Sequence, residues 1–195
     1  MEPDKRAKWF GLSQEALEAK AVWLAEQRNL QDQPTYFFRE AGKLVSFSWY
    51  HYPFASLAFF QTILALEASL RLLNGNQDRY FRDMFADVVK SGLVTDGIFS
   101  AYKFSEDPWK EYTGETFDAG FDDFEDREPK IYQPKPKTHV EVLSIVVPKL
   151  RNLYFHGNYH MSPDYLILAF QMRELADALA PAVSEVRESR WRQPT

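Results

Sequence analysis

The sequence predicts an all-α fold, a helical bundle of four to six helices interrupted by a long irregular insertion at about residues 100–137. Three observations support this prediction. Apolar residues recur every three or four positions along most of the chain, capping residues stand where these patterns begin and end, and the period is lost inside the insertion. We expect a single domain, 1–195, with an N-terminal helical extension over 1–47, a bundle core over 48–180 and a charged tail over 184–195.

Two helices are expected in the first fifty residues. One begins after Ser13, an N-cap with Glu15 in the first turn, and runs to about Asn29. The aromatic-rich segment 35–47 fits either a short helix or a strand, and we favour the helix.

The strongest helical pattern begins at Pro53, whose fixed φ suits a first helical position, and ends at Asn74 and Gly75, a left-handed C-cap. Its core face carries apolar residues at alternating spacings of four and three: Phe59, Ile63, Leu66, Leu70 and Leu73. The adjacent stripe consists of Phe60, Leu64, Glu67 and Arg71, so two ionisable side chains lie at the edge of an apolar face. A further helix over 77–91, stopped by Gly92, would complete a helical hairpin.

The insertion has no helical period. Over 101–137 it mixes ten acidic with six basic residues and eight aromatics, and it contains four prolines. Loops this long in compact domains are usually functional or disordered. The aromatic residues favour a loop that packs against the protein.

Helical patterning returns at Thr138, which forms a capping box with the glutamate three residues later. Pro148 lies inside this helix and removes one backbone hydrogen bond, so we expect a kink or a new helix start there, before a stop at Gly157. A last helix begins with Ser162 as N-cap and is expected to end near Pro181. The charged residues after Val183 are expected to be either mobile or a short helical extension.

Composition and charge exclude several classes of protein. With 23 Lys and Arg against 28 Asp and Glu, the net charge is −5, which argues against a surface that coats nucleic acid broadly. The absence of cysteine excludes disulfides, thiolate metal sites and cysteine nucleophiles. The longest apolar stretch, 54–66, is too short to span a bilayer, and the N-terminus lacks the apolar core of a secretory signal. We therefore expect a cytoplasmic protein without a membrane partner.

One segment, 150–157, carries most of the chemical information. It reads Leu-Arg-Asn-Leu-Tyr-Phe-His-Gly, so Arg151 and His156 stand five positions apart, with Asn152 directly after the arginine and Gly157 directly after the histidine. This motif, at the end of a helix that is followed by one last helix, resembles the signature of the HEPN superfamily of all-helical proteins.

The resemblance covers about residues 50–180 and implies a function. It implies a metal-independent endoribonuclease of the toxin–antitoxin or antiviral-defence type, without a cofactor, acting on RNA as a homodimer with the motif at the interface. An antitoxin protein would be a further partner. Glu67 and Arg71 match the polar residues that family members often place on an early helix facing the motif. In some relatives a tyrosine two positions beyond the histidine is modified, but here that position is Asn158, so this regulation is not expected.

The residue types suit RNA cleavage without a metal. Histidine changes its protonation near neutral pH, so His156 can move the proton of the attacking 2′-hydroxyl or of the leaving 5′-oxygen. The planar guanidinium of Arg151 can bind two phosphoryl oxygens and stabilise the charge that develops on them. Asn152 would orient His156 or the phosphate, and Glu67 with Arg71 would support the pair from behind.

Helix geometry limits how Arg151 and His156 can meet. At 100° per residue, side chains five positions apart point about 140° away from each other. Either the last turn unwinds before Gly157, or two chains contribute across a two-fold axis, as the resemblance implies.

Each motif residue also has a structural interpretation. Arg151 could cap carbonyls or pair with a carboxylate on a neighbouring helix, Asn152 could be a surface residue, and His156 could mark a helix terminus. Glu67 and Arg71, at an i,i+4 spacing, form a common stabilising pair. The alternative function is a non-catalytic HEPN-like module that binds nucleotide, RNA or a protein partner. A structural subunit of a larger assembly is a third interpretation.

Overall fold

The computed structural model describes residues 2–9, 12–26, 30–75, 78–100, 138–156 and 164–191. These residues form seven α-helices and one 3₁₀ helix, with no strand among them: α1 (Lys5–Trp9), α2 (Gln14–Ala25), α3 (Asp32–Phe47), α4 (Phe54–Leu73), α5 (Phe81–Lys90), η1 (Asp96–Ile98), α8 (His139–Phe155) and α9 (Asp164–Trp191). The predicted all-α class is confirmed. The six expected helices are present and α1 is additional, while the insertion predicted at about 100–137 lies almost wholly outside the described residues.

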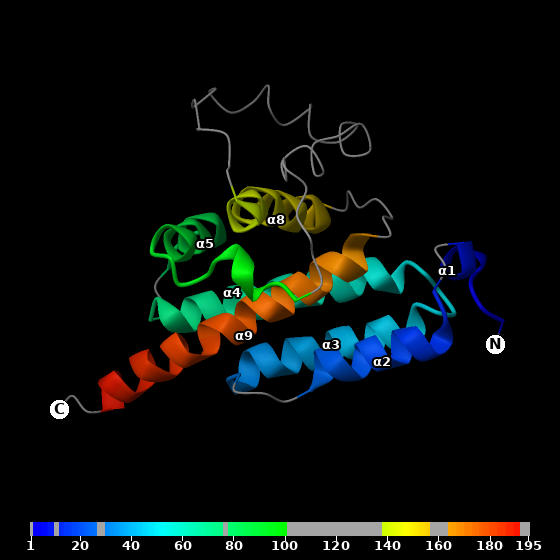
Figure 1. Cartoon of the computed structure of the whole chain (residues 1–195), viewed down its shortest axis with the longest axis horizontal. Coiled ribbons are helices and arrows are strands. Elements are labelled where there is room, and N and C mark those ends of the chain that lie inside the picture. The colour runs from blue at the N-terminus through cyan, green and yellow to red at the C-terminus, as the bar shows by residue number, and fades with distance from the viewer. Residues whose placement is uncertain are drawn as a thin grey trace, which may run out of the picture.

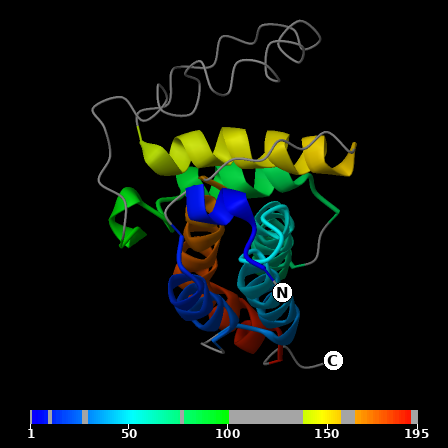
Figure 2. The ribbon, with the colours of Figure 1, turned by 90° about the vertical axis from the view of Figure 1, so that its right-hand side faces the viewer.

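The helices lie in two layers. Helices α2, α3, α4 and α9 run roughly along one direction, and α5 and α8 lie side by side across them (Figure 1). Figure 2 shows the four-helix layer nearly end-on beneath α8. Helix α4 occupies the centre of the fold because it packs against α3 and α9 along its length and meets α8 on another side.

One hydrophobic core joins the two layers. Leu17 of α2 and Phe38 of α3 belong to the same buried cluster as Leu143 of α8 and Met172 of α9. The segment 1–47, in which we expected a helical extension, contributes α2 and α3 to this cluster.

Helix α2 begins as predicted and ends early. The hydroxyl of Ser13 accepts a hydrogen bond from a backbone N–H of the first turn, but the helix ends at Ala25, before the predicted end near Asn29. Arg173 of α9 donates to two carbonyl oxygens at this end, at 2.5 and 2.8 Å. Because the partner of these carbonyls lies 147 to 149 residues further along the chain, no local pattern signals the end of α2.

Helices α3 and α4 follow the prediction closely. Segment 35–47 is helical, as part of α3, and α4 begins directly after Pro53. Gly75 follows α4 with a φ of 76°, the left-handed conformation that glycine adopts without strain.

Helix α5 differs from the prediction in two respects. It begins at Phe81, later than expected, although it stops as predicted before Gly92, whose φ is 72°. It also packs more extensively against α8 than against α4, so the hairpin that we predicted is not the main contact of α5.

Helix α8 continues through Pro148 as one helix, so the new helix start expected there as one of two outcomes does not occur. The missing N–H of the proline leaves the carbonyl of Ser144 without its intrahelical partner. Burial of Pro148 between apolar neighbours on the core face compensates for this single bond.

Helix α9 also continues through a proline, and the predicted end near Pro181 was wrong. The helix extends to Trp191, so the charged residues from 184 to 191 form a helical extension, one of the two outcomes expected for them. The apolar stripe explains the difference, because Leu179 and Val183 are both buried on either side of the proline. Burying such side chains stabilises by about 1.5–3 kcal/mol each, enough to offset the roughly 3 kcal/mol that an interior proline costs.

Within the described ranges, α4 is the helix whose length and apolar composition would suffice to cross a membrane. The protein itself buries 61% of its most apolar window. Its central place in the core accounts for that composition.

Candidate functional site

Helix α8, which carries the motif, is fixed at its N-terminus from two sides. Thr138 and Glu141 form the predicted capping box, in which each side chain accepts from the backbone N–H of the other, at 3.4 and 3.0 Å. Asp96 of η1 accepts two more bonds, from the N–H groups of His139 (3.1 Å) and Val140 (3.0 Å). Four consecutive backbone donors are thereby satisfied, and the carboxylates also complement the positive end of the helix dipole.

Arg151 of α8 and Arg71 of α4 meet at one carboxylate, that of Glu67. Arg151 donates from Nε to Oε2 (2.8 Å) and from Nη2 to Oε1 (3.3 Å). Arg71 donates to the same Oε1 from Nε (3.2 Å) and from Nη2 (2.8 Å). The structure therefore brings together three of the residues singled out in the sequence, in a group that we call the arginine cluster.

Charge and exposure differ across the arginine cluster. Two guanidinium groups share one carboxylate, so its net charge is +1. The side chain of Glu67 is only 8% exposed, whereas those of Arg151 and Arg71 are 25% and 37% exposed. A buried carboxylate thus holds two cationic groups whose outer edges reach solvent, an arrangement suited to binding a phosphate or another oxyanion.

Aromatic rings border the arginine cluster. The guanidinium carbon of Arg151 lies 4.7 Å from the centre of the Phe155 ring, and Phe155 meets Phe60 edge to face at 5.4 Å. Phe60 in turn stacks on Tyr154 at 5.4 Å. Phe155 is nevertheless 60% exposed. Sequence analysis gave Phe155 no role, although its i,i+4 spacing from Arg151 was a signal for a cation–aromatic contact.

His156 and Asn152 lie at the exposed end of α8. The helix is regular to Phe155, and His156 is its C-cap, with its N–H donating to the carbonyl of Asn152 (3.1 Å). The last turn therefore does not unwind before His156, and Arg151 and His156 project about 140° apart on one helix. The side-chain oxygen of Asn152 accepts from Nη1 of Arg151 at 3.5 Å, a long contact, so Asn152 adjoins the arginine.

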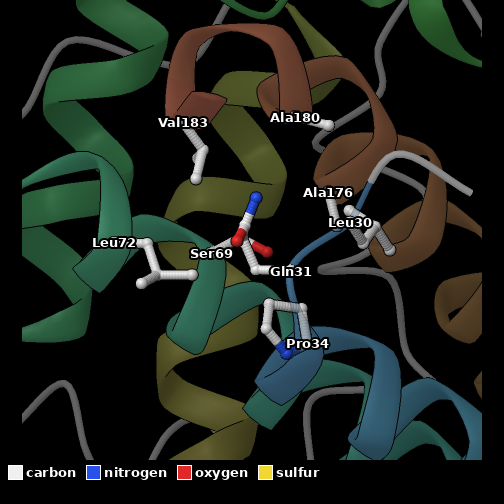
Figure 3. A pocket seen from close by; sticks show the side chains of 8 residues that line it. All are labelled: Leu30, Gln31, Pro34, Ser69, Leu72, Ala176, Ala180 and Val183. Carbon is white, nitrogen blue, oxygen red and sulfur yellow. The ribbon is translucent and has the colours of Figure 1, made fainter. Parts of the chain in front are cut away.

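A small pocket lies elsewhere, between the start of α3, α4 and α9 (Figure 3). It is lined by Leu30, Gln31, Pro34, Ser69, Leu72, Ala176, Ala180 and Val183. Its accessible space of about 10 Å³ admits roughly one water molecule. This pocket is too small for a nucleotide, so the candidate site is the open surface at the arginine cluster.

In the part of the chain that the structure describes, no group of three His, Asp or Glu side chains is placed to hold a metal ion. Gly157 and the predicted N-cap Ser162 lie outside the described residues.

Comparison with known proteins gives no relative: no family model, no curated protein and no solved structure matches this chain.

Proposed function

We propose that this protein is a metal-independent endoribonuclease of the toxin–antitoxin or antiviral-defence type, with Arg151 and His156 as its central pair. The observation that carries the proposal is the arginine cluster, in which a buried carboxylate holds two partly exposed guanidinium groups, one of them on α8, the helix that ends at the exposed His156. The resemblance of the motif to the HEPN signature supports the same assignment.

In the proposed reaction, the arginine cluster binds the phosphodiester and His156 transfers a proton. The 2′-hydroxyl gives its proton to His156 and attacks the phosphorus, the bond from phosphorus to the 5′-oxygen breaks, and the 5′-oxygen takes up a proton from the protonated imidazole. The products are a 2′,3′-cyclic phosphate and a free 5′-hydroxyl. The guanidinium groups of Arg151 and Arg71 would stabilise the charge on the phosphoryl oxygens, without a cofactor.

A homodimer is part of this proposal, and the geometry of α8 supports it. Because the helix is regular to Phe155, Arg151 and His156 of one chain point in different directions, which favours a site to which two chains contribute. We therefore expect a homodimer with the motif at its interface, and RNA as the substrate. Sedimentation of the wild-type protein should give twice the chain mass, whereas a strictly monomeric protein would contradict this arrangement. For the proposed toxin–antitoxin or antiviral role, an antitoxin protein would be a further partner.

The test is cleavage of a labelled RNA in EDTA by the wild-type protein and by His156→Ala. We expect His156→Ala to lose activity by about 10²–10⁴-fold, the usual contribution of general acid–base catalysis. His51→Ala is the matched control, because His51 is also exposed and lies in the turn between α3 and α4. Equal cleavage by the wild type and His156→Ala would exclude the assigned chemistry.

A specific observation favours a second function, a non-catalytic module that binds nucleotide or RNA. Arg151 directs two of its donors at Glu67 within its own chain, and this geometry serves phosphate recognition without requiring His156. Under this alternative, RNA binds and Arg151→Met weakens its binding, but neither the wild type nor His156→Ala cleaves it.

A further inference from the structure

The aromatic residue beside the arginine cluster lies in an unusual place for an apolar side chain. Phe155 is the last residue of α8 and is 60% exposed, although Phe60 and Tyr154 nearby are at least half-buried. A lone exposed phenylalanine needs no special explanation. This one lies directly next to a phosphate-binding arrangement, and that proximity is the basis of the inference.

The ring of Phe155 is held by two neighbours. The guanidinium of Arg151 lies over it at 4.7 Å, and Phe60 contacts it edge to face with an interplanar angle of 79°. These contacts restrict the rotation of the ring, so little conformational entropy remains to be lost when a ligand binds. The exposed fraction means that much of the ring surface stays open to solvent.

We propose that Phe155 is a stacking platform for a nucleobase whose phosphate is bound by Arg151 and Arg71. Arg151 contacts the ring of Phe155 on one side and the carboxylate of Glu67 on the other, so the proposed base and phosphate sites are adjacent to the same side chain. In a nucleotide, the base and the phosphate are likewise attached to the same sugar. The ring of Phe155 stacks on the base, and the guanidinium groups pair with the phosphate.

This arrangement defines the ligand class. A base is free to stack on a side chain only when it is not paired and stacked in a duplex, so the site takes single-stranded RNA or a free nucleotide. Stacking on a ring is tolerant of sequence because every base has a π-face. The inference rests on the proposed function for its RNA ligand, but it concerns base recognition and not the cleavage step.

The test compares three ligands on the full-length protein by isothermal titration calorimetry: adenosine 5′-monophosphate, ribose 5-phosphate and inorganic phosphate. We expect the nucleotide to bind about fivefold to hundredfold more tightly than ribose 5-phosphate, which is the range for stacking of one base. Phe155→Leu should abolish this preference, and Phe155→Tyr should retain it. Equal affinity for the nucleotide and the sugar phosphate, or no binding of either, would overturn the proposal.

Phe47→Leu is the matched control. Phe47 is also the last residue of its helix, α3, and is 56% exposed, but its ring contacts Phe54 and not an arginine. We expect Phe47→Leu to bind all three ligands as the wild type does. An equal loss of the base preference in Phe47→Leu and Phe155→Leu would also overturn the proposal.

Failure of this inference and failure of the proposed function give different results. If RNA is cleaved in a His156-dependent manner while Phe155→Leu retains the base preference, the nuclease stands and the stacking platform does not. If the nucleotide preference depends on Phe155 but no RNA is cleaved, the platform stands and the nuclease does not.

Discussion

Two arginines of this protein have nearly the same immediate partners and opposite surroundings. Arg151 and Arg173 each pair with a carboxylate and each lie over a phenylalanine ring, at 4.7 and 4.8 Å. Arg173 is fully buried, and its guanidinium spans α9 and the end of α2. Arg151 is partly exposed and shares its carboxylate with a second arginine.

The difference shows that partners alone do not reveal the role of an arginine. The donors of Arg173 bind two backbone carbonyls and Asp177, so little remains for a ligand. The arginine cluster has more positive charge than its single carboxylate neutralises, and solvent reaches it. Exposure and charge balance therefore distinguish a group that holds the fold from a group that is available to bind an anion.

The largest expected effect is on stability, and it should separate the two arginines. Arg173→Met removes the donor of two hydrogen bonds to carbonyls at the end of α2 and breaks the buried ion pair with Asp177, so we expect a loss of about 3–5 kcal/mol. Arg151→Met leaves Glu67 paired with Arg71 and should cost about 1 kcal/mol or less. Urea unfolding followed by circular dichroism measures both. Equal losses in the two variants would remove the distinction.

The sequence predicted features that depend on neighbouring residues better than features that depend on distant contacts. Local signals identified what is local: the cap at Ser13, the left-handed glycine after α4 and the capping box of α8 were each read from neighbouring residues. The i,i+4 pair of Glu67 and Arg71 was also visible in the sequence.

Long-range contacts were not predictable in the same way. The early end of α2 depends on Arg173, and the second anchor of α8 depends on Asp96, more than 40 residues upstream. The extension of α9 past Pro181 depends on burial against other helices, which outweighs the local cost of proline. Pairing of Arg151 with a carboxylate on a neighbouring helix was one of the interpretations that the sequence allowed, but no local pattern identified Glu67 as that carboxylate. The catalytic roles of Arg151, Asn152 and His156 stay predictions.

The next largest effect concerns the carboxylate that holds the arginine cluster. Glu67→Gln leaves two guanidinium groups together without a counter-charge, so we expect a loss of about 1–3 kcal/mol in unfolding free energy. The charge of the cluster rises from +1 to +2, so inorganic phosphate should bind more tightly at low ionic strength. Calorimetric titration measures the second effect. Weaker phosphate binding by Glu67→Gln would contradict the view that the cluster recognises anions.

A moderate effect is expected where α8 is anchored. Asp96→Ala removes two hydrogen bonds at the N-terminus of α8 and should cost about 1 kcal/mol. Hydrogen exchange should show the loss of protection mainly in α8, which carries Arg151, and less in α9, which carries Arg173. Asp83→Ala is the control, because Asp83 also lies in the first turn of a helix, α5, and its carboxylate pairs with the side chain of Arg82 (3.6 Å). Uniform loss of protection across both helices would argue against a local anchor.

The smallest effect involves a third carboxylate–guanidinium pair, Asp4 with Arg6, in which the arginine side chain is more exposed than that of Arg151 or Arg173. The guanidinium of Arg6 and the N–H of Tyr52 hold the pKa of the Asp4 carboxyl well below its ordinary value. A lowered pKa means that the pair stabilises the fold at neutral pH and that this stability is lost as the pH falls below about 3.9. Asp4→Asn should therefore cost less than about 1 kcal/mol at pH 7, since Arg6 is 38% exposed and water screens the pair.

The difference in unfolding free energy between the wild type and Asp4→Asn should shrink steadily from pH 5 to pH 2, because the Asp4 carboxylate of the unfolded chain becomes protonated over that interval while the folded chain, in which the pKa is lower, keeps it ionised. Urea titrations at each pH measure it. A difference that stays constant from pH 5 to pH 2 would contradict this prediction. It would show that the negative charge of Asp4 does not contribute to stability, and that the side chain acts through its shape and its hydrogen bonds alone.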